Sequence, residues 1–228
     1  MQSISQAPLQ GVASYYDGRV REFGPTPWGV DWTCELTQQL RFVQLLKLVG
    51  RRRRFSLNDL GCGYGALLPF VRARFGPEVD YIGADVAEEM IVQATRLHGG
   101  EGRFVTSSAL PRVADFSVAS GIFNVQLGYP PATWRAFVRD VLRELHRASR
   151  LGFAVNFIRP ARRGQVPREG LYRSRPSYWA EFCRREFGAQ VEVVQGYGLR
   201  EFTLLVRTAS PAVRRGASGR APSSRTAP

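Results

Sequence analysis

The sequence predicts an α/β fold in which a doubly wound, mostly parallel sheet of seven strands ends in an antiparallel hairpin. Strand-like and helix-like segments alternate along most of the chain, a pattern typical of parallel strands joined by helices. Residues 152–158 are apolar on both faces, as expected for a strand buried in the centre of a parallel sheet. The last two strand-like segments are separated by only a few residues, too short for a parallel crossover, and therefore predict a hairpin.

Each expected element rests on a local signal. The first helix has an apolar face, and the strand that follows it ends in a glycine-rich turn. Gly76 and Pro77 end the second helix, and prolines begin the long helix near residue 130. The expected order is helix 33–49, strand 55–60, helix 66–75, strand 79–84, helix 87–97, strand 103–107, strand 115–120, helix 130–149, strand 152–158, helix 177–187, and strands 190–197 and 201–207.

The chain divides into three parts. Residues 1–35 form an N-terminal arm without a clear helical period, and residues 36–207 form one domain of ordinary size. Residues 208–228 contain mainly Ala, Ser, Pro, Gly and Arg and are expected to be a disordered tail. No apolar run reaches the ~20 residues of a membrane span, and the N-terminus lacks the order of a secretory signal. These features predict a cytoplasmic protein with no membrane partner.

The net charge of +13 suggests nucleic acid as one alternative partner. The position of the charge weakens that interpretation, since part of it lies in the tail and the cluster 51–54 follows an expected helix. Cations at a helix C-terminus interact favourably with the negative end of its dipole. A structural role for this cluster is therefore favoured over a phosphate-binding one.

The segment from Asp59 to Gly65, Asp-Leu-Gly-Cys-Gly-Tyr-Gly, joins an expected strand to a helix. Its glycines permit a tight turn and let a ligand approach the main chain closely. Asp85 follows twenty residues later, at the end of the next strand, where a carboxylate can accept both hydroxyls of a ribose. The same glycines also fit the fingerprint of dinucleotide-binding proteins. Asp59, two residues before the first glycine, and the terminal hairpin favour a different cofactor.

This glycine segment resembles the first motif of class I S-adenosylmethionine-dependent methyltransferases, which have a Rossmann-like sheet. Asp85-Val86-Ala87-Glu88-Glu89-Met90 resembles their second motif. The resemblance implies that S-adenosylmethionine is the cofactor, that the turn holds its methionine part, and that Asp85 and Met90 contact ribose and adenine. Ser107 and Ser108 occupy the region of an adenine contact. The candidate cofactor-binding residues are Asp59, Gly61, Cys62, Gly63, Gly65, Asp85, Val86, Met90, Ser107, Ser108, Ser120 and Gly121.

Segments 15–19, 29–32, 120–125 and 197–202 look like those of a bacterial subgroup whose members include proteins encoded near glycan or natural-product genes. The resemblance implies a small-molecule acceptor, methylated on oxygen or nitrogen. The expected fourth strand ends in Ser-Gly-Ile-Phe-Asn, without the Asn/Asp-Pro-Pro-aromatic motif common in enzymes that methylate nucleobase or glutamine amines. Two alternatives remain: a nucleic-acid methyltransferase and a non-catalytic cofactor-binding protein.

The candidate catalytic residues are Tyr16, Asp31 and Asn124. Methyl transfer needs alignment of the reactants and exclusion of water, and a base only for some acceptors. The aromatic residues of the arm predict either a lid over the site or a segment that simply packs on the core. His98 and His146 are expected at the surface, and no acidic pair with metal-ligand spacing follows the fourth strand.

Overall fold

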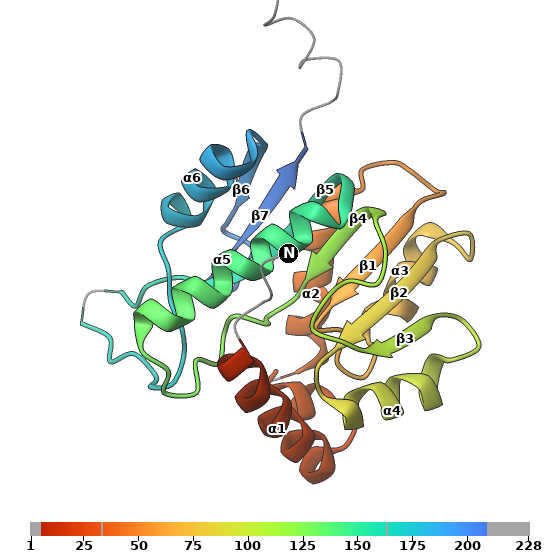
Figure 1. Ribbon diagram of the computed structural model, residues 1–228, viewed down its shortest axis with the longest axis horizontal. Helices are drawn as coiled ribbons and strands as arrows, with labels where there is room; N and C mark the ends of the chain where they lie inside the picture. The colour runs from red at the N-terminus through yellow and green to blue at the C-terminus, as the bar shows by residue number, and fades with distance from the viewer. Residues whose placement is uncertain (1–5, 33, 163, 209–228) are drawn as a thin grey trace, which may run out of the picture.

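The computed structural model describes residues 6–32, 34–162 and 164–208, and the expected tail lies almost wholly outside them. These residues form a seven-stranded sheet with helices on both faces (Figure 1). The strand order is β3-β2-β1-β4-β5-β7-β6, and in the described sheet β7 alone runs against the others. The strands are β1 (Ser56–Leu60), β2 (Asp80–Asp85), β3 (Arg103–Thr106), β4 (Ala114–Ala119), β5 (Ser149–Ile158), β6 (Gln190–Val194) and β7 (Glu201–Arg207). The predicted fold class is confirmed.

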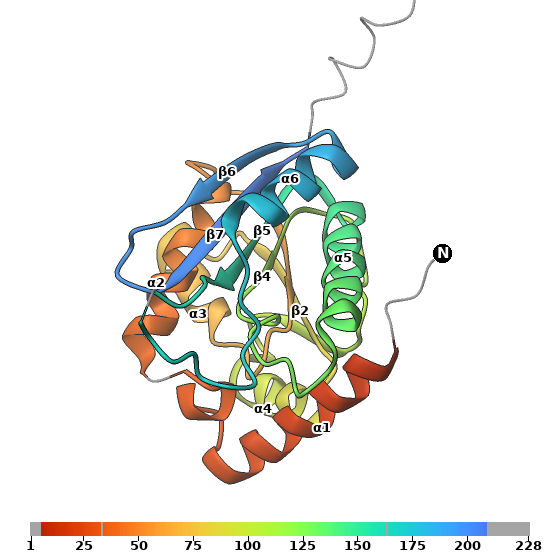
Figure 2. The same ribbon diagram turned by 90° about the vertical axis from the view of Figure 1, so that its left-hand side faces the viewer.

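Helices α5 and α6 cover one face of the sheet, and α2 and α3 cover the other (Figure 2). On β5, Phe153, Val155 and Phe157 belong to the core under α5 and α6, while Ala154 belongs to the core under α2 and α3. This alternation is the reason why the strand reads as apolar on both faces. The helices are α1 (Gln6–Phe23), α2 (Glu35–Leu45), α3 (Leu67–Phe75), α4 (Glu88–His98), α5 (Pro131–Arg147) and α6 (Pro176–Phe187), with 3₁₀ turns η1 (Pro27–Val30) and η2 (Leu46–Leu48).

Most expected boundaries differ from the observed ones by a few residues. The first expected helix is divided, because α2 ends at Leu45 and a 3₁₀ turn continues to Leu48. Strand β6 stops at Val194 rather than at residue 197. Gly196 and Gly198 follow with φ of +77° and +86°, a left-handed conformation that ends an extended strand. None of the described helices is long and apolar enough to cross a membrane.

The absence of a helical period in the arm was a wrong expectation, because α1 is an 18-residue helix. Its inner side carries Leu9, Val12, Tyr16 and Val20, spaced three or four residues apart. Gly11 and Gly18 interrupt the apolar pattern of the helix. A Cβ at Gly11 would lie 2.8 Å from the Tyr129 hydroxyl oxygen. Glycine avoids this contact but lowers the helix propensity of the segment.

Helix α1 lies beside α4, far away in the sequence (Figures 1 and 2). The carboxylate of Asp17 accepts a hydrogen bond from the Glu89 backbone N–H at 3.0 Å, and Arg21 pairs with the Glu89 side chain at 3.2 Å. The first contact satisfies a free donor in the first turn of α4. Contacts at this helix end thus attach the arm to the domain.

Candidate functional site

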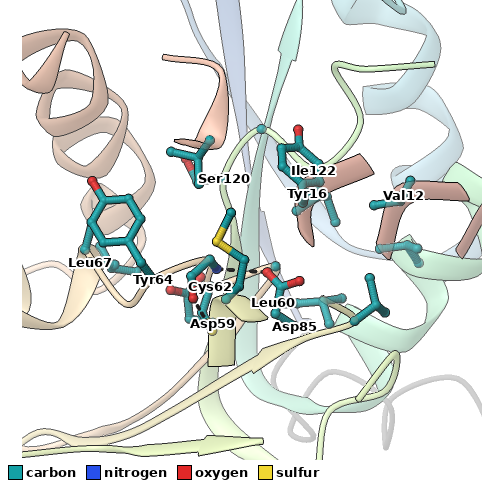
Figure 3. A pocket seen from close by; sticks show the side chains of 18 of the residues that line it. Val12, Tyr16, Asp59, Leu60, Cys62, Tyr64, Leu67, Asp85, Ser120 and Ile122 are labelled. Carbon is teal, nitrogen blue, oxygen red and sulfur yellow. Dashed lines mark hydrogen bonds between the residues drawn. The ribbon is translucent and has the colours of Figure 1, made fainter. Parts of the chain in front are cut away.

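A cavity opens at the carboxyl ends of β1, β2 and β4, the general ligand crevice of such sheets. Asp59 and Asp85 lie near each other in it, with Tyr64 on one side and Tyr16 and Val12 on the other (Figure 3). Its wall is formed by Leu9, Val12, Tyr16, Val30, Trp32, Gln38, Phe42, Asp59, Leu60, Gly61, Cys62, Gly63, Tyr64, Ala66, Leu67, Asp85, Val86, Met90, Ser107, Ser108, Ser120, Gly121, Ile122, Phe137 and Val141. We call this the first cavity.

The glycine turn forms part of this wall with its bare main chain. Gly61 and Gly63 have φ of +72° and +54°, which L residues with a Cβ rarely adopt. A Cβ on Gly61 would lie 2.1 Å from Cγ2 of Ile122, and one on Gly63 would lie 3.1 Å from Cγ1 of Val30. No side chain fits at Gly61, and any at Gly63 crowds Val30. Glycine is therefore required at Gly61 by both the left-handed backbone and the packing of Ile122, and at Gly63 mainly by the backbone.

Asp85 is buried at the end of β2, and its carboxylate is held by the main chain. Oδ2 accepts the N–H of Gly63 at 2.8 Å, and Oδ1 accepts the N–H of Ala87 at 3.0 Å. Burial raises the pKa of Asp85, and these backbone donors oppose that shift. A carboxylate has about four acceptor sites, so acceptor capacity remains for a ligand.

Asp59, at the end of β1, is 2% exposed and accepts a hydrogen bond from the Tyr81 hydroxyl at 2.6 Å. Burial raises the pKa of Asp59 to about 7, the Tyr81 hydrogen bond opposes the shift, and the nearby charge of Asp85 adds to it. A carboxyl group that titrates near neutral pH inside a cavity is typical of a functional site.

Eleven of the twelve candidate cofactor-binding residues line the first cavity, and Gly65 is the exception. A Cβ on Gly65 would meet His98 and Phe104 at 2.9 and 3.0 Å, so this glycine faces the packing behind the turn. The Ser107 hydroxyl donates to the backbone oxygen of Ala109 at 2.7 Å, within its own loop.

A second cavity of about 340 Å³ adjoins the first, and four residues line both: Tyr16, Val30, Trp32 and Gly121. Asp31 and Asn124 line this second cavity and not the first. Of the candidate catalytic residues, Tyr16 alone reaches both. The remaining lining residues of the second cavity are Tyr15, Arg41, Val125, Leu127, Ile158, Arg168, Glu169, Gly170, Leu171 and Glu201.

Asp31 is fixed by two neighbours from α1. Its Oδ2 accepts the Tyr15 hydroxyl at 2.8 Å, and its Oδ1 pairs with Arg19 at 3.1 Å. Burial and the hydrogen bond to Asp31 raise the pKa of Tyr15 to about 12. Burial, followed by the charge of Asp31, also raises the pKa of Tyr16. Both tyrosines therefore carry their protons at neutral pH, and Arg19 is engaged within the arm.

The border between the cavities rests on a network that the sequence analysis missed. The Arg41 guanidinium donates from Nε to both carboxylate oxygens of Glu201 at 3.0 Å, and Glu201 accepts from Asn156 Nδ2 at 2.7 Å. Asn156 in turn accepts the Gly121 N–H at 2.7 Å. The Trp32 ring lies 3.8 Å from Cζ of Arg41 and covers Gly121, where a Cβ would be 2.3 Å from the ring. We call these five residues the border ring.

The side of the first cavity that α2 supplies was also not predicted from the sequence. Tyr64 donates its hydroxyl to Oε1 of Gln38 at 3.0 Å, and Phe42 lines the cavity one turn further along the helix. The spacing of Gln38 and Phe42 places them on one helix face, a signal that marked the face as buried without indicating what it covers. Neither His98 nor His146 lines either cavity. Within the described residues, no cluster of His, Cys, Asp and Glu is arranged to hold a metal ion.

Comparison with known proteins supplies a family. The Mycobacterium tuberculosis protein named "Putative methyltransferase Rv1506c" is 41% identical over 167 residues, which cover 72% of this chain and 100% of that protein. Nocamycin O-methyltransferase of Saccharothrix syringae is 40% identical over 83 residues, 36% of this chain and 29% of that protein. No family model matches the chain.

A solved structure shares the fold. It is the Burkholderia thailandensis 1,6-didemethyltoxoflavin-N1-methyltransferase with bound 1,6-didemethyltoxoflavin and S-adenosylhomocysteine. The TM-score is 0.60 at 18% identity, over 92% of this chain and 94% of that one. This chain belongs to the methyltransferase family of its M. tuberculosis relative, and its fold is that of the class I methyltransferases.

Proposed function

We propose that the protein transfers a methyl group from S-adenosylmethionine, bound in the first cavity, to a small molecule bound in the second. The observation that carries this proposal is the border that the two cavities share. A direct transfer requires donor and acceptor to meet in one water-poor space. Tyr16, Trp32 and Gly121 lie at that meeting point.

The residues of the first cavity fit the cofactor. Gly61 and Gly63 line the cavity with main chain that carries no side chain, which suits the methionine part of the molecule. The free acceptor sites of Asp85 suit the two ribose hydroxyls, and Met90, with Val86, Ser107 and Ser108, offers a wall for the adenine. We assign Asp59 to the cofactor's positively charged amino group, since a buried carboxylate near a cation is stabilised in its ionised form.

When bound, S-adenosylmethionine supplies a methyl group on a positively charged sulfur. The chain's own residues align the acceptor and exclude water. Tyr16 and Trp32 shield the border, and Asp31, held by Tyr15 and Arg19, can accept a proton from an acceptor hydroxyl or amine in the second cavity. In this proposal α1 and η1 act as a lid, because Val12, Tyr16 and Val30 close the first cavity.

The acceptor in this proposal is a small molecule, natural-product-like or glycan-related and methylated on oxygen or nitrogen. The lining of the second cavity supports it, because aromatic side chains lie there beside a few polar groups, as is typical of small-molecule pockets. The relative from Saccharothrix syringae is named Nocamycin O-methyltransferase, and this name supports transfer of the methyl group to oxygen.

Calorimetric titration tests the cofactor assignment. We expect binding of S-adenosylhomocysteine and none of NADH. Gly63→Val should abolish binding, because the side chain strains the left-handed backbone and crowds Val30 in the cavity wall. Gly100→Val is the matched control, since Gly100 has ordinary φ and open space around it. Binding of NADH alone would overturn the assignment. Mass spectrometry of extracts incubated with methyl-labelled cofactor then identifies the compound that gains a methyl group.

A further inference from the structure

Asn124 has a rigid main chain in the loop that follows β4. Its N–H donates to the Gly121 oxygen at 3.0 Å, and its oxygen accepts the Tyr172 N–H at 2.8 Å. Only 5% of the residue is exposed. These hydrogen bonds hold the backbone of Asn124 in place, so its side chain is positioned before any ligand binds.

The side-chain amide of Asn124 is buried without a partner. Neither Nδ2 nor Oδ1 makes a hydrogen bond to any described residue, and Asn124 lines the second cavity. A buried donor or acceptor without a partner is unfavourable, because it has lost its hydrogen bonds to water. The charged groups deep in the same wall are already paired, Arg41 with Glu201 and Asp31 with Arg19. The amide of Asn124 is therefore a buried group of this wall whose donor and acceptor are both left for a ligand.

The wall around Asn124 contains three aromatic residues, Tyr15, Tyr16 and Trp32. Tyr15 and Tyr16 pack edge to face with ring centroids 5.1 Å apart, and Trp32 lies between the two cavities. The loop after β5 is joined to the Asn124 loop, because the Gln126 N–H donates to the Gly170 oxygen at 2.8 Å. Leu127, which also lines the cavity, has φ of +52°, a strained conformation of the kind found at ligand sites.

We propose that Asn124 recognises the acceptor through a planar edge that carries a hydrogen-bond donor beside an acceptor, as in a lactam, a cis-amide or an amino-heterocycle. An asparagine amide presents one acceptor and one donor side by side in a plane, and such an edge satisfies both at once. The rings of Tyr15, Tyr16 and Trp32 in the wall suit the flat faces of the same group. This inference rests on the proposed function, because it describes the acceptor of the same site.

Matched ring compounds test the inference on the full-length protein saturated with S-adenosylhomocysteine. The probes are 2-quinolone, which carries the lactam edge, and coumarin, in which a ring oxygen replaces the lactam N–H. Methyl glucoside represents an acceptor that offers only hydroxyls. Affinities are measured by ligand-observed NMR with wild type, Asn124→Ala and the control Val166→Ala, whose side chain is exposed.

We expect 2-quinolone to bind wild type and Val166→Ala with equal affinity. Wild type should bind coumarin about tenfold more weakly than 2-quinolone, and Asn124→Ala should bind 2-quinolone about tenfold more weakly than wild type does. Equal affinities for 2-quinolone and coumarin would overturn the proposal, as would no binding of 2-quinolone at millimolar concentration. Binding of methyl glucoside in its place would assign the pocket to hydroxyl recognition. S-adenosylhomocysteine should bind Asn124→Ala normally, and its failure to bind wild type would instead refute the cofactor assignment.

Discussion

The affinity for S-adenosylhomocysteine should rise about eightfold between pH 6.0 and 7.5, because Asp59 must lose a proton to face the cofactor's amino group. In the protein without ligand, burial holds the pKa of Asp59 at about 7. Roughly one tenth of the molecules then carry the ionised group at pH 6.0 and roughly three quarters at pH 7.5. A nearby cation lowers the pKa of a carboxyl, so binding releases a proton and is favoured by higher pH. The eightfold gain corresponds to about 1.2 kcal/mol.

Isothermal titration calorimetry at both pH values measures the affinity, and two buffers of different ionisation enthalpy reveal the released proton. Asp59→Asn is the control, since an amide still accepts the Tyr81 hydroxyl and has no proton to lose in this range. We expect weaker binding by this variant, with no change between pH 6.0 and 7.5. Equal wild-type affinities at both pH values would refute the reasoning. A pH dependence that persists in Asp59→Asn would move the titrating group to Asp85.

Four further outcomes are expected. The wild type should lose stability relative to Asp59→Asn as pH rises from about 4 to 7, because the folded state retains the Asp59 proton to a higher pH than the unfolded state does. The loss in free energy of unfolding, measured with urea, should be at most about 4 kcal/mol. A difference between the two proteins that stays constant with pH would contradict this. Asp85→Ala should weaken S-adenosylhomocysteine binding by about 1.5–3 kcal/mol in calorimetry through lost hydrogen bonds, and normal binding would make the carboxylate structural. Arg41→Leu should cost about 3–5 kcal/mol in urea unfolding by leaving Glu201 buried and unpaired, with most of it recovered in Arg41→Leu/Glu201→Leu, and no recovery would contradict the pairing. Deleting residues 1–32 should leave a folded protein with poor turnover, and S-adenosylhomocysteine should protect the intact arm from protease; equal protection with and without ligand leaves the arm a purely structural role.

The sheet and the glycine turn were predictable because their signals are local. The glycine turn lies between a strand and a helix, and the short joint before β7 dictates a hairpin. Asp85 is the last residue of β2, the strand that follows the glycine turn and α3 along the chain. Helix α1 was missed because its apolar side is narrow and Gly11 and Gly18 interrupt the pattern.

The second cavity depends on tertiary structure and could not be predicted as a whole. Asp31 and Asn124 were identified individually. They line the cavity together with residues 168–171, from the loop after β5, and with Glu201 of β7, and no local pattern connects these segments. The pair of Arg41 and Glu201 is separated by 160 residues in the sequence. A buried ion pair at that separation has no periodicity that would mark either partner.

The border ring has a consequence for the order in which parts of the site fold during synthesis of the chain. Glu201 belongs to β7, the last strand of the sheet, whereas Arg41 belongs to α2 and emerges from the ribosome much earlier. Until β7 is inserted between β5 and β6, Arg41 lacks its counter-charge and the Gly121 loop lacks its anchor through Asn156. Contacts between such distant parts of a chain form late, after the loop between them has closed. A nascent chain can therefore complete the glycine turn long before the border between its two cavities takes shape.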